Sequence, residues 1–481
     1  MSLARKVAHN TIIQAGGKII GTILAVGTIF FLARYLGDFG YGQYTTIIVY
    51  LQIFSILMDL GLFIILIKKL AQAKSPEQEN IFINNTFTFR LASGLFFLSI
   101  AVVIALFIPQ YDAIIKWGIL ITAVNFLFVS LNQLLTVIYQ KHLAMMRVAL
   151  AEIVGKIFLF LSVLSVIYIF HSGLLSVMLA VVIGGTVNFL MLYSGTLKYY
   201  KLKLAFDFKI WRDLINASWP IALSISLNMI YFKADTLLLG ILQTQKEVGI
   251  YGAPYKVLEV IITLPAMFVG LVMPILSSAY EKKDLEKFRK VLHKSFDAIF
   301  IMILPLIAGA IMLAQPLMIF VTGKDFTANI QDLGKLLQIL IWAVAFIFIG
   351  TLTGYLIVIL NKQKSAIKAY GFVALTSLIG YLIFIPKYSY FGAAAVTVYS
   401  ELAMVLFGLY YIYSSTKILP RWQVFSKAFL ASGIMMLVLY FTVNLNIFIQ
   451  IIIGAGVYFV SLYLLGGISK QEASDIINTK N

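Results

Sequence analysis

Cysteine is absent and charge is scarce in this sequence. None of the 481 residues is cysteine, which excludes disulfide bonds, thiol chemistry and cysteine-ligated metals. Charged residues make up 12% of the chain and hydrophobic residues 61%, and the mean hydropathy is +0.96. Soluble domains are about 45–50% apolar and about 25% charged. The composition therefore excludes a soluble globular protein.

Catalytic motifs are also missing. The chain has no HExxH, no GxSxG and no Walker A loop, and its four histidines, His9, His142, His171 and His293, occur singly. Each of those motifs carries a specific chemistry, namely zinc hydrolysis, acyl transfer or nucleotide binding. The sequence therefore predicts a protein that is not an enzyme, holds no metal or cofactor and cannot itself use ATP.

Long apolar runs are what the sequence does contain. Crossing a bilayer takes about 20 apolar residues in a helix, and fourteen runs come close to or exceed that length: 11–33, 42–67, 82–107, 117–139, 147–170, 174–195, 214–241, 249–279, 294–321, 334–360, 366–385, 391–413, 424–443 and 446–467. The runs are continuous rather than alternating, so helices are expected and not barrel strands. The predicted fold is all-α and polytopic, with fourteen transmembrane helices.

Basic residues fix the predicted orientation. With a cytoplasmic N-terminus and residues at the run ends counted with the nearer side, 26 Lys and Arg fall on the cytoplasmic side, 6 on the other side and 5 deeper within runs. Cytoplasmic loops carry this excess in membrane proteins, so both termini are predicted to be cytoplasmic in a multi-pass cell-membrane protein. The anionic inner leaflet accounts for the net charge of +17, and nucleic acid is not expected as a partner.

Two cytoplasmic connections carry apolar residues at helical spacing. One is 196–213, with Phe206, Phe208, Trp211 and Leu214 at its end, and the other is 280–293, with Leu285, Phe288, Leu292 and Phe296. Amphipathic helices lying in the membrane interface are predicted for both. Ordinary solvated loops are the alternative.

A glycine-aromatic pattern occurs twice, after the first and the seventh run. It contains Gly40 and Gly42 in the first copy, and Gly249, Gly252 and Pro254 in the second. Six runs separate the copies, which predicts parallel repeats about a pseudo-two-fold axis, with these residues as turns or gates. The alternative is that short outer turns are simply rich in glycine. The predicted domains are an N-terminal lobe at 1–195, an interfacial linker at 196–213, a C-terminal lobe at 214–413, and two further helices with a tail at 414–481.

Burying a charge inside a membrane span costs free energy, so each charged residue in a predicted span is a candidate functional residue. Basic candidates for an anionic head group are Lys18, Arg90, Lys233, Lys256 and Lys156. Acidic residues that could serve as their partners, or as Na⁺ or H⁺ coupling sites, are Asp59, Asp235, Glu259 and Glu401. The competing explanation is local, because Glu152 with Lys156 and Lys256 with Glu259 can pair along their own helices. In addition, Gly17 and Gly21 permit a close helix contact.

The N-terminal stretch from Asn10 through Gly37, the Gly40–Tyr44 segment and above all the segment Ala234–Ala253, with ADTLLLG followed by EVGIYGA, resemble the polysaccharide-biosynthesis (Wzx-type) lipid-linked oligosaccharide flippases. These belong to the multidrug/oligosaccharidyl-lipid/polysaccharide exporter superfamily. The resemblance implies twelve core helices in two lobes around a cationic cavity, plus two extra helices. It also implies inner-to-outer transfer of a polyprenyl-(pyro)phosphate oligosaccharide, with Lys18, Arg90, Lys233 and Lys256 binding phosphate. Where relatives have a base in the second helix, this chain has Asp59.

Three other functions stay open on the sequence. They are a lipid II flippase, a multidrug or cation antiporter of the same superfamily, and a membrane polysaccharide polymerase, although the short outer loops disfavour the polymerase. Expected partners are the lipid-linked oligosaccharide, membrane lipids, and the glycosyltransferases and polymerase of the same pathway. A monomer is the default expectation.

Overall fold

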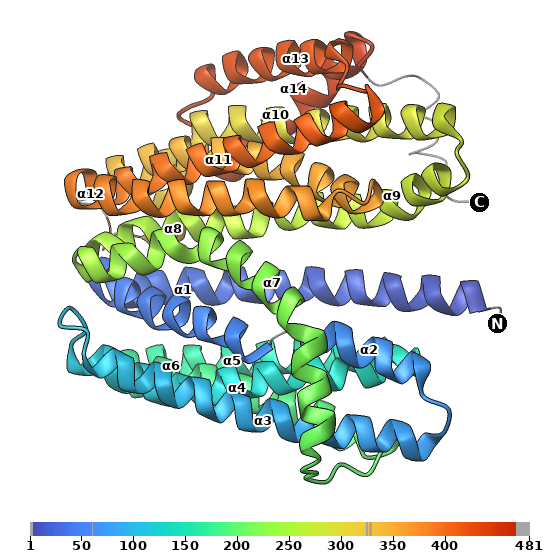
Figure 1. Ribbon diagram of the computed structural model, residues 1–481. Coiled ribbons are helices and arrows are strands. Elements are labelled where there is room, and N and C mark those ends of the chain that lie inside the picture. The colour runs from blue at the N-terminus through green and yellow to red at the C-terminus, as the bar shows by residue number, and fades with distance from the viewer. Residues whose placement is uncertain (1–2, 60, 324–325, 327–329, 468–481) are drawn as a thin grey trace. The chain divides into compact units, whose positions relative to one another are not determined.

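The computed structural model describes residues 3–59, 61–323, 326 and 330–467, and within them the side chains of 3–15, 64 and 220–232 are left aside. The described chain is helical (Figure 1). Its elements are α1 (Leu3–Asp59), α2 (Leu62–Gln72), α3 (Pro76–Leu106), α4 (Ala113–Lys141), α5 (Met145–Ser165), the π-helical turn η1 (Val166–Phe170), α6 (Leu174–Thr196), α7 (Phe208–Leu242), α8 (Gln245–Ile261), α9 (Thr263–Glu281), α10 (Leu285–Thr322), α11 (Ile330–Ile359), α12 (Gln363–Thr416), α13 (Trp422–Phe441) and α14 (Ile447–Leu464). The predicted tail after residue 467 lies outside the described residues.

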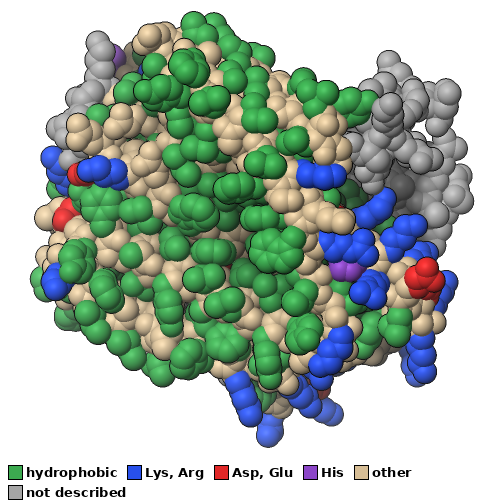
Figure 2. Space-filling view, turned by 90° about the horizontal axis from the view of Figure 1, so that it is seen from above, with side chains coloured by type: hydrophobic (Ala, Val, Ile, Leu, Met, Phe, Trp, Pro, Cys, Tyr) green, Lys and Arg blue, Asp and Glu red, His purple; other side chains and the backbone are tan. Residues whose placement is uncertain are grey.

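The length of the helices and the exposure of their apolar side chains indicate a membrane protein. Eleven candidate membrane spans occur among the described residues. Large apolar side chains such as Leu106, Phe107, Leu437 and Phe441 are exposed, and hydrophobic side chains cover much of the face in Figure 2, while Lys and Arg gather towards its edges. Water-facing surfaces rarely carry apolar patches of this extent. The chain is a multi-pass membrane protein.

Side-chain caps explain where many helices begin. The side chains of Ser75, Asp112, Asp207, Asp284 and Asn446 each accept a hydrogen bond from a backbone N–H in the first turn of α3, α4, α7, α10 and α14, respectively. Such caps satisfy donors that have no partner within the helix. They therefore set the first turn of each of these helices.

Several predicted spans are joined or broken. Predicted spans 1 and 2 share α1, which is kinked at Gly37 (φ 63°), and α1 ends before Gly61, which has φ 69°. Glycine adopts these left-handed values without steric cost. Predicted spans 11 and 12 share α12, kinked at Ser389. Predicted span 8 breaks between α8 and α9, where Pro265 lies in the first turn of α9 and its missing N–H needs no partner.

The chain forms two compact units, residues 1–252 and 253–481. In the structure α7 packs on α1 and falls within the first unit, and the predicted lobes at 1–195 and 214–413 stay a prediction. In the first unit α6 packs on both α4 and α5, and a buried core that includes Leu32, Ile47 and Ile119 joins α1, α3, α4, α5 and α6. In the second unit α10, α13 and α14 share another core, around Ala308, Ala431 and Leu462.

The two predicted interfacial helices have different outcomes. Residues 200–207 have no regular secondary structure, so the helix predicted across 196–213 is wrong there. In the second prediction, at 280–293, the helix is present from Leu285 as the start of α10, and its place in the membrane interface stays a prediction. A turn at 282–284 leads directly into α10, whose Phe288, Leu292 and Phe296 are fully buried. The apolar residues at helical spacing thus face the protein core. Periodicity alone does not distinguish an apolar face that contacts lipid from one that contacts protein.

Polar side chains of α3 hold the extended segment 200–207. Asn84 donates to the Lys201 carbonyl (3.2 Å) and accepts from the Lys203 N–H (3.1 Å). Thr88 and Asn85 accept from the N–H groups of Ala205 and Asp207 at 2.9 Å. At the start of this segment, burial and the hydrogen bond donated to Glu79 raise the pKa of Tyr200. The backbone thus obtains from α3 the partners that a helix would have supplied.

Replacing Asn84 by alanine is expected to free this segment. The change removes two backbone hydrogen bonds, and a buried group left unsatisfied costs about 1–3 kcal/mol. Because Lys201 and Lys203 lie in the segment, limited trypsin digestion should cut Asn84→Ala faster than the wild type there. Gln78→Ala, an exposed change on the same helix, is the control, and equal cutting rates in all three proteins would contradict the assignment.

Candidate functional site

The first candidate cations lie where α1 meets α5. A Cβ on Gly17 would lie 2.8 Å from the Cβ of Ala149, and one on Gly21 would lie 2.7 Å from Nζ of Lys156. The predicted close contact through Gly17 and Gly21 is thus present, between α1 and α5. Lys156 Nζ is 2.7 Å from Oε1 of Glu152, and both side chains are partly exposed. Lys18 is exposed one turn before Gly21. Lys18 therefore presents a charge on the accessible side of this contact.

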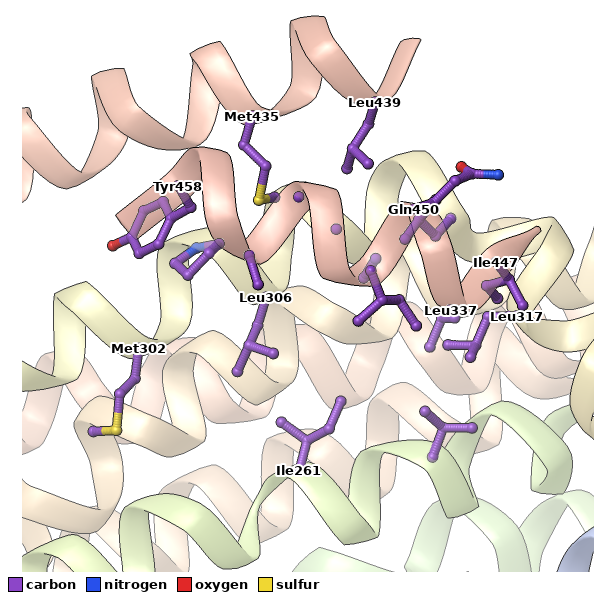
Figure 3. Close-up of a pocket in the computed structure, with 18 of the residues that line it drawn as sticks. Ile261, Met302, Leu306, Leu317, Leu337, Met435, Leu439, Ile447, Gln450 and Tyr458 are labelled. Carbon is purple, nitrogen blue, oxygen red and sulfur yellow. The ribbon is translucent and has the colours of Figure 1, made fainter. Parts of the chain in front are cut away.

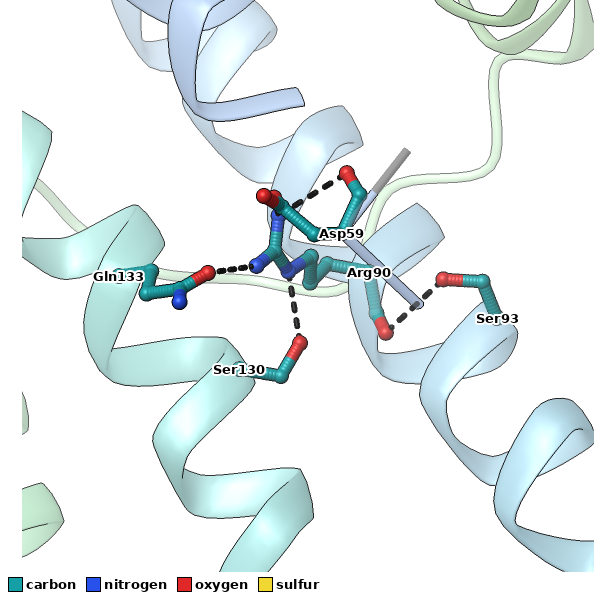
Figure 4. Close-up of polar contacts among 5 residues, drawn as sticks. All are labelled: Asp59, Arg90, Ser93, Ser130 and Gln133. Atoms are coloured by element: carbon teal, nitrogen blue, oxygen red, sulfur yellow. Dashed lines mark hydrogen bonds and ion pairs between the residues drawn. The ribbon is translucent and has the colours of Figure 1, made fainter. Parts of the chain in front are cut away.

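Arg90 lies in a very different setting (Figure 4). Its side chain is fully buried and forms an ion pair with Asp59. Its Nε donates to Oγ of Ser130 at 2.7 Å and Nη2 to Oε1 of Gln133 at 2.6 Å. Nη1 also donates to the Asp59 carbonyl at 3.3 Å, at the end of α1. All three nitrogens therefore have protein acceptors, and the guanidinium connects α1, α3 and α4.

This cluster gives Asp59 a local role. Asp59 is the last residue of α1, and the carbonyls at a helix C-terminus have no partner within the helix. A cation there also interacts favourably with the helix dipole. Ser130 and Gln133, three residues apart on α4, were not among the predicted site residues. A polar pair at that spacing in an apolar run is the signal that could have identified them.

Lys233 and Asp235 are both buried in α7. Oδ2 of Asp235 accepts from the Tyr251 hydroxyl at 2.7 Å, and Oδ1 accepts from the N–H of Thr236 at 2.6 Å. Lys233 is near enough for its charge to act on the Asp235 carboxyl. The bond to Tyr251 connects the two parts of the ADTLLLG…EVGIYGA segment. Asp235 thus fixes the corner between α7 and α8.

Two further predicted groups lie in the second unit. Nζ of Lys256 is 2.7 Å from Oε2 of Glu259, an i,i+3 pair on α8 with about one fifth of each side chain exposed (18% and 25%). Pro254 lies inside the same helix. Glu401 is buried within α12. The coupling-ion role of Glu401 and of the other carboxylates stays a prediction.

The glycines of the two predicted turns lie within helices, in α1 just after its kink at Gly37 and in α8, and the two segments lie against each other. A Cβ on Gly42 would lie 1.6 Å from the carbonyl oxygen of Gln245, and one on Gly249 would lie 1.9 Å from that of Asp38. No side chain fits at either position without separating the backbones. Gly252 faces Thr45, and Gly40 faces Leu36 of its own helix. Gln245, which the sequence did not single out, also accepts from the Thr46 hydroxyl at 2.6 Å.

An apolar cavity of ≈ 500 Å³ occupies the second unit (Figure 3). Its walls come from α8, α9, α10, α11, α13 and α14 and include Ile261, Leu306 and Met435. Its two main polar side chains are already bonded elsewhere, since Gln450 donates to the Leu445 carbonyl at 2.7 Å and Tyr458 to the Ile301 carbonyl at 2.8 Å. The cavity therefore suits a hydrocarbon chain and not a polar ligand.

Comparisons with solved structures agree with this fold. The chain matches a lipid II flippase, MurJ, in an inward closed conformation with a TM-score of 0.77 at 18% identity, covering 97% of this chain and 100% of the other. It matches an inward-facing multidrug resistance MATE family transporter of the MOP superfamily with a TM-score of 0.68 at 14% identity, covering 85% and 99%. The fold is thus of the MurJ and MATE type.

Curated relatives match at higher sequence identity but over less of the chain. A probable low-salt glycan biosynthesis flippase, Agl15, of Haloferax volcanii is 24% identical, covering 52% of each chain. The capsular polysaccharide biosynthesis protein CapF of Staphylococcus aureus is 26% identical, covering 45% of this chain and 54% of its own. The chain thus spans about half the length of the curated relatives it matches.

Two family models match the chain, and one of them covers more than half of it. The MatE model matches residues 220–383, and the model described as polysaccharide biosynthesis protein matches residues 7–280. The second match takes in α1 through α9, and with them Lys18, Arg90, the Asp235–Tyr251 corner and the glycines of both predicted turns. The chain belongs to the polysaccharide biosynthesis protein family, whose members are transporters of the MOP superfamily.

Proposed function

We propose that the protein is a flippase that moves a polyprenyl-(pyro)phosphate-linked oligosaccharide from the inner to the outer leaflet for cell-surface polysaccharide synthesis. Family membership carries the proposal, and the similarity to Agl15, a probable glycan biosynthesis flippase, supports the substrate class. The polar head group cannot cross hydrocarbon unaided, because burying unpaired charge costs many kcal/mol. A polar path through the protein replaces the lost hydration.

The proposed topology has fourteen crossings. Eleven candidate spans, a second crossing in each of the kinked helices α1 and α12, and α7 make up that number. An even number leaves both termini on the cytoplasmic side, in accord with the basic loops. Twelve crossings would form two six-helix lobes, and α13 and α14 would follow them.

Phosphate and lipid would use different surfaces of the protein. Among the candidate phosphate contacts, Lys18 has an exposed side chain on α1. Lys156 lies against Gly21, one turn further along α1. The apolar cavity between α10 and α14 has the chemistry to hold part of a polyprenyl chain. Lys233, Lys256 and Arg90 stay candidates for the cationic path, although Arg90 would first have to leave its four acceptors.

Transport in proteoliposomes tests the proposal. Purified protein should move a fluorescent polyprenyl-pyrophosphate oligosaccharide between leaflets, as measured by its accessibility to a membrane-impermeant quencher. Lipid II, tested in the same vesicles, addresses the second candidate, which the fold match to MurJ favours. Transport of lipid II alone, or proton- or sodium-driven efflux of organic cations without glycolipid movement, would overturn the proposal.

A further inference from the structure

A buried histidine lies near the start of α10. His293 is 6% exposed, and neither ring nitrogen has a hydrogen-bond partner among the described residues. Its neighbours Leu292 and Phe296 are fully buried, so packing alone would favour an apolar residue here, because burying an unpaired polar group costs free energy. Buried polar side chains are almost always paired, so an unpaired one needs an explanation, such as a bound ion.

Positive charges lie next to this histidine. Arg289 precedes His293 by four residues, so both side chains project from the same face of α10. The groups whose charges act on the histidine ring are Arg289 and Arg421. Asp297, a carboxylate one turn further along α10, is not among them. Both arginines are exposed, and neither forms an ion pair with a described residue. An anion can therefore reach both guanidinium groups.

The packing of α10 on α13 brings Arg421 to this position. The ring centroids of Phe300 and Phe425 lie 5.2 Å apart, and a Cβ on Gly309 would lie 4.0 Å from Cε of Met435. The later residue of α10 thus contacts the later residue of α13, which means that the two helices run in the same direction. The start of α13 therefore lies beside the first turns of α10, which hold the histidine.

The beginning of α13 adds hydrogen-bond donors. Arg421 is its N-cap residue, and the arginine side chain forms no cap hydrogen bond. The first N–H groups of a helix have no partner within it and carry partial positive charge, which favours an anion. Arginine in turn pairs with phosphate through two parallel N–H···O bonds. A phosphate group here can accept hydrogen bonds from the helix start and both guanidinium groups, with the imidazole as a further partner.

Exposed aromatic residues extend from these donors along α13. Trp422 and Phe429 are 75% and 60% exposed. Phe425 joins them, with its ring centroid 5.3 Å from that of Trp422 and 6.2 Å from that of Phe429. Aromatic residues are enriched where a membrane meets water, and basic pockets between transmembrane helices on the cytoplasmic side bind anionic lipid head groups. The surroundings therefore favour a phospholipid over a soluble phosphate.

We propose that Arg289, His293 and Arg421 bind the phosphate group of an anionic phospholipid of the inner leaflet, whose hydrocarbon chain lies along the aromatic residues of α13. The three residues all belong to the second unit, whereas Lys18, the exposed phosphate candidate, belongs to the first. The bound lipid joins α10 to α13 and is not transported. The proposal therefore goes beyond the proposed function and does not rest on it.

Lipid binding is measurable on the full-length protein in detergent micelles. Because the chain lacks cysteine, Ser426→Cys, at an exposed position of α13, accepts an environment-sensitive fluorophore as a unique label. Phosphatidylglycerol added to the micelles should give a saturable change in fluorescence, and phosphatidylcholine, whose head group has no net charge, should give little. Inorganic phosphate at matched ionic strength tests the soluble source of the same chemistry and should also give little.

Removing charge at the site should weaken this binding. Arg289→Gln and Arg421→Gln should each raise the Kd for phosphatidylglycerol by roughly ten- to hundredfold, as expected for a lost charge-assisted hydrogen bond. Lys290→Gln is the matched control, because it removes the same charge from the next position, which is also exposed but about 100° around the helix. It should leave the Kd nearly unchanged. His293→Leu loses no hydrogen bond to a described residue, so it should fold normally and bind more weakly.

A missing saturable response to phosphatidylglycerol would overturn the proposal, and so would an equal loss of affinity in Lys290→Gln and the arginine variants. Saturation by inorganic phosphate at the same residues, without preference for the lipid, would overturn the lipid and assign the site to soluble phosphate. Should His293→Leu not fold, the arginine variants, at exposed positions, still decide the question. Lipid binding with the expected pattern, in a protein that moves no glycolipid, would keep the site and reject the proposed function.

Discussion

Arg90→Ala is expected to leave little folded protein in the membrane. Arg90 is fully buried, and its nitrogens bind Asp59, Ser130 and Gln133. Removing one partner of a buried ion pair costs about 3–5 kcal/mol, because the other charge stays behind uncompensated. Total stabilities are only about 5–15 kcal/mol. The monodisperse yield in detergent and the thermal unfolding midpoint would measure the loss.

Two variants make this test specific. Lys156→Ala removes a charge whose side chain is 30% exposed, and surface pairs contribute about 0–1 kcal/mol, so this protein should fold normally. Arg90→Met combined with Asp59→Leu removes both charges and should recover most of the yield. An Arg90→Ala protein that folds like the wild type but no longer transports would instead support the phosphate-binding role predicted from the sequence.

Lys18→Ala is expected to show the opposite pattern, with normal folding and lost transport. Lys18 is exposed on α1, and exposed substitutions usually change stability by less than about 0.5 kcal/mol. A charge-assisted hydrogen bond to phosphate contributes about 1.5–3 kcal/mol, which corresponds to roughly ten- to hundredfold in binding. Transport of the fluorescent glycolipid in proteoliposomes, at several substrate concentrations, would measure this change.

Charge and not shape should matter at position 18. Lys18→Arg keeps the positive charge and should retain most of the transport, whereas Lys18→Met keeps much of the length without the charge and should fail like alanine. Equal transport by Lys18→Met and wild type would remove Lys18 from the phosphate site. It would then direct attention to Lys233 and Lys256.

Local sequence patterns predicted much of the structure of this protein. Continuous apolar runs identified the helices, because each transmembrane helix satisfies its own backbone and needs only an apolar surface. Helical spacing also identified Lys156 with Glu152, and Lys256 with Glu259, as local pairs, and both are present. It failed at 200–207, where Asn84, Asn85 and Thr88 on another helix supply the hydrogen bonds.

The sequence did not predict which residues far apart in the chain contact each other. Nothing near Arg90 in the chain shows that Asp59, Ser130 and Gln133 surround it, and nothing near Gly42 shows that Gln245 lies against it. The sequence by itself determined an all-helical membrane protein, its family and the local ion pairs, since these depend on composition and on spacing within one helix. Only the tertiary structure decided which charges are buried and which backbones touch, because both depend on partners that lie many residues apart and meet only when the helices pack.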